Sequence, residues 1–129
     1  MSCAQFKTLR ESLGVTTQWV ADAVQVNLRT AQRWEATLTP PDDAVMLLEH
    51  WLAVFHRQMG TLLDELRTFE DEHGYPDTLE MVRYRTLQSA QRAGNDWPEE
   101  MHNGFLRYAL LTLTFEGYDL RINYCEEEK

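Results

Sequence analysis

The segment of residues 16–35, TTQWVADAVQVNLRTAQRWE, places the strongest constraint on the fold, because it contains two short runs of helical apolar spacing with a break between them. Side chains three and four positions apart lie on one face of a helix. The residues with this spacing are Ala21 and Val24 in the first run, and Ala31 and Trp34 in the second. We predict two short helices, joined by a tight turn at residues 25–27, that pack through these faces on each other and on an earlier helix.

Helix start and stop signals surround this segment. The repeat of Phe6, Leu9 and Leu13 predicts an earlier helix. A hydroxyl or amide oxygen can satisfy a free amide at a helix start, and glycine readily ends a helix. The expected caps are Thr16 or Thr17 for the second helix, Asn27 for the third, and Gly14 at the end of the first. The three helices are predicted over residues 5–13, 16–24 and 28–36.

A much longer helix is predicted after this N-terminal part. Pro41, Asp42 and Asp43 are typical of a helix start, since proline is tolerated in the first turn and carboxylates favour the positive end of the helix dipole. Apolar residues then recur every three or four positions over residues 44–72, which predicts a helix of about 30 residues. Gly60 costs it about 1 kcal/mol relative to alanine. Its apolar surface exceeds what three short helices can cover, so we expect it also to pack on the C-terminal part or on a second subunit.

The C-terminal part has a different pattern. Residues 79–85, LEMVRYR, and 118–124, YDLRINY, alternate as strands do, and we predict that they pair in a small antiparallel sheet. Helices are predicted at residues 87–93 and from Pro98 to Phe115. The expected fold is therefore mainly α, of the α+β kind. It has an N-terminal unit over residues 1–39, and the long helix with the C-terminal region over residues 40–129.

Charge is distributed unevenly along the chain. The net charge is −9, but residues 1–39 carry four basic and three acidic side chains, whereas residues 40–129 carry eight basic and eighteen acidic ones. The acidic part repels phosphate and is expected to orient the molecule with its N-terminal end toward a polyanion. The longest apolar segment, residues 105–115, is too short for a membrane span of about 20 residues. Cys3 and Cys125 form no CxxC pair, which fits a reduced, cytoplasmic setting. Together with the short apolar segment, this predicts a cytoplasmic protein with no membrane partner.

Residues 6–38 resemble the lambda-repressor-like, Cro/C1-type helix-turn-helix family. The matching residues are Thr17 or Gln18 at the head of the second helix, Val20-Ala21 within it, Val26-Asn27 before the third helix, and Arg29-Thr30-Ala31 leading to Trp34-Glu35. The piece WEATLTPPDDAV also resembles bacterial and phage regulators of the YdiL and anti-CRISPR-associated repressor type, in which a C-terminal α+β portion is expected to dimerise. The family commonly has glycine at the position of Gln25, because the turn residue tends to be left-handed, which costs another residue about 1 kcal/mol or more.

The resemblance implies that the third helix enters a DNA major groove. Arginine suits guanine, glutamine suits adenine, and an apolar side chain suits the thymine methyl group. The residues expected to contact bases are Leu28, Arg29, Gln32 and Arg33. Those expected to contact phosphates are Lys7, Arg10, Thr17, Gln18 and Asn27. The simpler alternative is that Arg29 and Arg33 are solvated, or pair with Glu35 and Asp22. Aromatic spacing favours core positions over base stacking for Trp34, Trp51, Phe55 and Tyr108.

Catalytic chemistry has no positive signal in the sequence. The four histidines, His50, His56, His73 and His102, do not form HxxxH or HExxH, and neither a glycine-rich phosphate loop nor a nucleophile motif is found. We therefore predict no catalytic, metal or cofactor site. The expected function is sequence-specific binding of double-stranded DNA by a homodimeric transcriptional regulator, a repressor on a pseudo-palindromic operator, with any effector left open. The alternative is a protein–protein interaction module that uses the helix-turn-helix as a scaffold without specific DNA binding.

Overall fold

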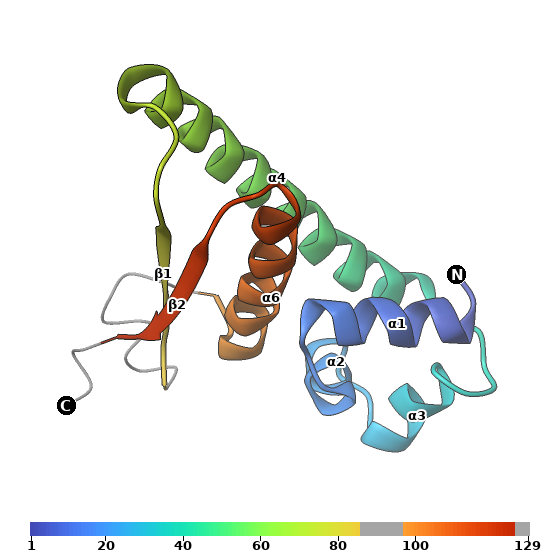
Figure 1. Cartoon of the computed structure of the whole chain (residues 1–129). Coiled ribbons are helices and arrows are strands. Elements are labelled where there is room, and N and C mark those ends of the chain that lie inside the picture. Colours follow the sequence, from blue (N-terminus) through green and yellow to red (C-terminus); the bar gives the residue numbers. More distant parts are fainter. Residues whose placement is uncertain (86–96, 126–129) are drawn as a thin grey trace. The chain divides into compact units, whose positions relative to one another are not determined.

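A computed structural model describes residues 1–85 and 97–125 of the chain (Figure 1). These residues divide between two compact units, 1–56 and 57–129, and each unit is described below by itself. The helix predicted at residues 87–93 lies outside the described residues. Among the described residues, no helix is long and apolar enough to cross a membrane.

The N-terminal unit begins with the three short helices expected from the sequence. They are α1 (Cys3–Leu13), α2 (Thr17–Ala23) and α3 (Leu28–Arg33). Ser2 and Gln5 form a reciprocal capping box at the start of α1, and Gly14 ends that helix in the left-handed conformation, with φ of 88°. Helix α3 is shorter than predicted, because residues 34–37 form turns instead of a further helical turn.

The core of this unit lies on the predicted apolar faces. Phe6, Ala21 and Ala31 are fully buried, and Trp34 is 6% exposed. The rings of Phe6 and Trp34 meet edge to face, with their centroids 6.3 Å apart. Such aromatic pairs contribute about 0.5–1.5 kcal/mol beyond the burial of their area. The prediction that Trp34 belongs to the core is therefore confirmed.

Helix α4 (Asp42–His73) is continuous over 32 residues, which confirms the predicted long helix. Asp42 and Asp43 occupy its first turn, where carboxylates favour the helix dipole. Gly60 lies within the helix without ending it, and no atom lies within 4 Å of the position that a Cβ would take. The helix ends before Gly74, whose φ is 80°. Residues of α4 up to position 56 belong to the N-terminal unit, and the later ones belong to the C-terminal unit.

The C-terminal unit contains β1 (Leu79–Arg83), α6 (Glu99–Phe115) and β2 (Leu120–Tyr124). The two strands pair in parallel, with Leu79 opposite Leu120, so the predicted antiparallel pairing is wrong. The physical reason is the connection. A tight hairpin returns the chain antiparallel, whereas a helix crossing between two strands brings the second one back in the same direction. Helix α6 lies between β1 and β2 in the chain and forms that crossover (Figure 1).

Helix α6 supplies the most deeply buried residues of the C-terminal unit. Its buried side chains follow helical spacing and are Met101, Phe105, Leu106, Ala109 and Leu113. Tyr108, predicted to be core, is 37% exposed, because it lies beside this face and not on it. Phe115 and Leu111 are 87% and 59% exposed. The strands contain only half-buried and exposed residues.

The turn that follows α6 is tied to the end of α4. The Tyr118 hydroxyl donates a hydrogen bond to the Glu70 carboxylate, and the ring of Tyr118 stacks on that of Tyr75 with centroids 5.1 Å apart. The hydrogen bond to Glu70 is the main reason that the pKa of Tyr118 is raised to about 12, and burial adds to it. These contacts join the turn after α6 to the last turns of α4 and to the residue that follows Gly74.

Candidate nucleic-acid interface

The turn between α2 and α3 has the geometry that the family resemblance implies. Gln25 has φ of 60° and is the one non-glycine residue with positive φ in the described part of the chain. The amide of Val26 donates to the carbonyl of Ala21 at 2.9 Å, which closes the turn. Ala21 has no exposed surface, so its small side chain permits the close approach of the two helices. Gln25 therefore occupies the left-handed position where the family commonly has glycine, at a cost of about 1 kcal/mol.

Helix α3 is held at its start by Asn27. The side-chain oxygen of Asn27 accepts hydrogen bonds from the backbone amide of Thr30 at 2.8 Å and from the Thr30 hydroxyl at 2.9 Å. This cap satisfies one of the free amides in the first turn. The predicted cap position of Asn27 is confirmed, and its amide nitrogen is the part of this side chain that can donate to a phosphate oxygen.

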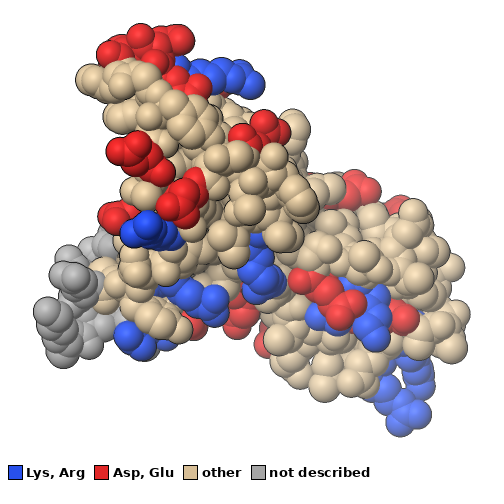
Figure 2. Space-filling view, viewed as in Figure 1, with Lys and Arg blue, Asp and Glu red and all other residues tan. Residues whose placement is uncertain are grey.

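The face of α3 that points away from the core is exposed. Ala31 points into the core, and the exposed residues on the helix are Leu28, Arg29, Gln32 and Arg33, which were predicted to contact bases. Leu28 is 37% exposed. Basic side chains project into solvent at the α3 end of the N-terminal unit (Figure 2). The structure thus brings the four predicted base-contacting residues together on one surface.

The side chains of the two arginines of α3 are not used to hold the described fold together. In residues 1–85 and 97–125, no ion pair joins Arg29 or Arg33 to a carboxylate. The two acids expected as alternative partners of these arginines form other contacts. Glu35 binds Arg10, and Asp22 accepts a hydrogen bond of 2.8 Å from Gln18. Both arginine side chains therefore keep their donors for an external ligand or for water.

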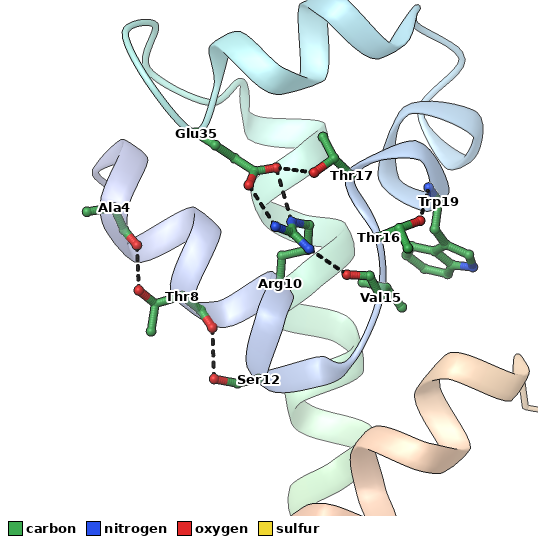
Figure 3. Close-up of polar contacts among 9 residues, drawn as sticks. All are labelled: Ala4, Thr8, Arg10, Ser12, Val15, Thr16, Thr17, Trp19 and Glu35. Carbon is green, nitrogen blue, oxygen red and sulfur yellow. Dashed lines mark hydrogen bonds and ion pairs between the residues drawn. The ribbon is translucent and has the colours of Figure 1, made fainter.

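Beneath this surface lies a network around the Glu35 carboxylate (Figure 3). Arg10 binds Glu35 through two hydrogen bonds, from Nε at 3.0 Å and from the terminal nitrogen at 2.9 Å. Its other terminal nitrogen donates to the Val15 carbonyl at 2.7 Å. The Thr17 hydroxyl also donates to Glu35, at 2.9 Å. The network joins α1, the start of α2 and the residue that follows Trp34.

This network changes the roles available to two predicted phosphate contacts. The side chains of Arg10 and Glu35 are only 12% and 8% exposed, and all three guanidinium nitrogens of Arg10 have partners within the protein. Arg10 therefore neutralises a nearly buried carboxylate, and three of its five N–H donors are used within the protein. Thr17 directs its hydroxyl into the same network. The charge facing solvent here comes from Lys7, which is exposed.

A polar hollow of about 300 Å³ opens above the network. Its lining brings together Lys7, Arg10, Thr17, Gln32, Glu35 and Ala36. Because Arg10 neutralises Glu35, the Lys7 ammonium gives the hollow a net positive charge. Gln18 and Asn27 do not line the hollow, and both are exposed. Lys7 and Asn27 therefore remain available for phosphate contacts, and Gln18 keeps one amide hydrogen besides the one bonded to Asp22.

Glu35 organises a network that the sequence does not predict, since the residue is expected only as part of the family motif or as a partner for Arg29 or Arg33. Its position directly after the buried Trp34 was the available signal, because a carboxylate next to a core residue needs a partner when it is half-buried. Nothing in the spacing of Arg10 and Glu35 along the chain identified that partner.

Within residues 1–85 and 97–125, no group of three His, Cys, Asp or Glu side chains is placed to hold a metal ion. No protein-family model and no curated protein matches the chain. The resemblance of residues 6–38 to the Cro/C1-type family therefore stays a prediction from the sequence.

Proposed function

We propose that this protein is a sequence-specific DNA-binding transcriptional regulator that acts as a homodimeric repressor. One observation carries the proposal. Two short helices meet at a left-handed turn residue, and the second helix presents Leu28, Arg29, Gln32 and Arg33 to solvent while Ala31 anchors it in the core. A short helix held in this way fits the major groove of B-form DNA.

The proposed readout follows from the chemistry of these side chains. Arg29 and Arg33 lie four residues apart and project from one face, so each can form two hydrogen bonds with guanine O6 and N7. Gln32 can pair with adenine, and Leu28 can contact a thymine methyl group. A good two-bond contact discriminates by about 1–3 kcal/mol against the wrong base. The contacts to the DNA phosphates are assigned to Lys7, Gln18, Asn27 and the main-chain amide groups at the start of α2.

A dimer is required by the small positive charge of this surface. Residues 1–39 carry only four basic side chains, and Arg10 is held within the protein, so one copy gains little from phosphate contacts. Two copies double these contacts and read half-sites about 34 Å apart, or a multiple of that distance. We assign the dimer contact to the C-terminal unit, where the exposed Leu111 and Phe115 of α6 lie one helical turn apart.

The decisive experiment is selection of bound sequences from a random pool of double-stranded DNA by the full chain. We expect enrichment of a palindromic motif whose two halves are equivalent. No enrichment at moderate salt would contradict the proposal and favour the protein-interaction alternative.

A double substitution tests whether α3 is the DNA-binding surface. Arg29→Ala with Arg33→Ala should abolish binding to the selected sequence while leaving the helical circular dichroism unchanged. The matched control is Arg57→Ala with Arg67→Ala, which removes the same charge from exposed positions of α4 in the C-terminal unit. Equal loss of binding in both double variants would show that net charge, and not α3, determines affinity.

A further inference from the structure

The C-terminal unit contains a groove that the proposed DNA contact does not use. It has a volume of about 260 Å³ and lies between the second half of α4 and the start of β1. Its floor is apolar, formed by Leu62, Leu66, Phe69 and Leu79, and its carboxylates are Glu65 and Glu80. Phe69 is 44% exposed, although Leu66, one turn earlier, is 7% exposed. A large aromatic side chain at the edge of an apolar floor offers surface that water contacts unfavourably.

The lining of the groove carries two negative charges, those of Glu65 and Glu80. Arg121, opposite Glu80 in the sheet, pairs with Asp119. Lysine and arginine do not contribute to its lining, and no described ion pair neutralises Glu65 or Glu80. Acidic side chains gather at the far end of α4 (Figure 2). Asp71 and Glu72 lie in the last turn of that helix, where the dipole is negative and a carboxylate is unfavourable, so a cationic partner would relieve their charge.

We propose that this groove binds a basic segment of another protein, in which an aromatic or branched aliphatic side chain lies between arginine or lysine residues. The apolar side chain rests on Phe69 and Leu66, and the flanking cations pair with Glu65 and Glu80. The complementary charge steers the encounter, and burial of the apolar side chain holds the complex together. The proposal is independent of DNA binding, because the groove belongs to the C-terminal unit and α3 to the N-terminal one.

Size and charge select this occupant over others. Pockets for drug-sized molecules usually enclose about 300–1,000 Å³, so a groove of about 260 Å³ fits one or two side chains better than a cofactor. The carboxylates exclude nucleic acid and other polyanions.

The test uses the full chain and a fluorescein-labelled peptide, Gly-Arg-Arg-Trp-Leu-Arg-Arg-Gly, followed by fluorescence anisotropy. Two further peptides separate the contributions, one with Gly-Gly in place of Trp-Leu and one with glutamate in place of every arginine. We expect binding of the first peptide alone. Amide chemical shifts in two-dimensional NMR spectra should change mainly at residues 62–69 and 76–80.

Three variants make the result specific. Glu65→Gln with Glu80→Gln, and separately Phe69→Ala, should each weaken peptide binding by about tenfold or more. The control, Glu49→Gln with Glu116→Gln, removes the same charge from exposed positions outside the groove and should change binding by less than about twofold. Circular dichroism checks that each variant is folded.

The proposal is overturned by any of three results. The first is equal weakening by the groove and control double variants, because it would show general charge attraction. The second is equal binding of the peptide that lacks Trp-Leu, because it would leave the apolar floor without a role. The third is a loss of dimer in light scattering of Phe69→Ala, because it would assign the groove to a second copy. Retained DNA binding in Glu65→Gln with Glu80→Gln keeps this test separate from the proposed DNA function.

Discussion

The Arg10 guanidinium donates two hydrogen bonds, of 3.0 and 2.9 Å, to the carboxylate of Glu35, 25 residues later in the chain. Both side chains are nearly buried, at 12% and 8% exposure. A pair of this kind fixes orientation as well as distance, because the planar fork of arginine matches the two carboxylate oxygens. The position of the segment after α3 relative to α1 depends on this contact.

Removal of one partner from this pair should strongly destabilise the N-terminal unit. Glu35→Ala leaves Arg10 nearly buried without its counterion, and we expect a loss of about 3 kcal/mol in the free energy of unfolding. Urea denaturation followed by circular dichroism measures it. The control is Asp64→Ala, which breaks the exposed Arg67–Asp64 pair, whose side chains are 73% and 76% exposed, and should cost less than about 1 kcal/mol. A comparable loss in both variants would argue against a special role for the Arg10–Glu35 pair.

The left-handed turn residue offers a stabilising substitution. Gln25 has φ of 60°, so Gln25→Gly should relieve strain and raise the free energy of unfolding by up to about 1 kcal/mol. The gain is reduced by the greater freedom of glycine in the unfolded chain. Thermal unfolding checks the direction. Gln58→Gly, at an exposed position in the middle of α4, is the control and should lower stability by about 1 kcal/mol. A loss of stability in Gln25→Gly would show that the glutamine side chain contributes more than the strain costs.

The exposed apolar face of α6 gives a test of the proposed dimer. Phe115 is 87% exposed, so Phe115→Glu should leave the fold intact but place a charge in the contact between copies. We expect a monomer in light scattering at micromolar concentration, where the unchanged protein is expected to be a dimer. Ala53→Glu adds the same charge at an exposed position of α4 in the N-terminal unit and should remain dimeric. A dimer in both variants would place the contact elsewhere.

His102 makes the stability of the C-terminal unit dependent on pH. Burial lowers the pKa of His102 below its ordinary value of 6.5, Arg83 lowers it further, and a hydrogen bond with the Val82 carbonyl partly offsets both. The unfolded chain therefore binds a proton more readily than the folded one does. Stability is retained above about pH 6.5 and falls as the pH decreases from there to the lower pKa of the folded state.

Replacement of His102 isolates this contribution. His102→Gln should reduce the difference in unfolding free energy between about pH 7.5 and about pH 5.5, both measured by urea denaturation. His56→Gln, at an exposed position of α4, serves as the control. An unchanged difference in His102→Gln would assign the acid sensitivity to other groups.

Local signals accounted for most of the helical structure. Gly14 and Asn27 end or begin their helices as predicted, and the apolar repeat gave the extent of α4, because caps and helical periodicity act over only a few residues. The burial of Trp34 followed from the same periodicity. The exposed face of α3 could also be predicted, since it is the complement of the face that contains Ala31.

The amino-acid sequence by itself determined the helices, their caps and the side chains that α3 offers to a ligand, because these depend on neighbours one to four positions apart. Tertiary structure decided the rest. The crossover through α6 made the strands parallel, the packing face of that helix left Tyr108 exposed, and Arg10 turned inward to Glu35. Each of these outcomes depends on groups that are distant in the chain, and only folding sets which of them meet.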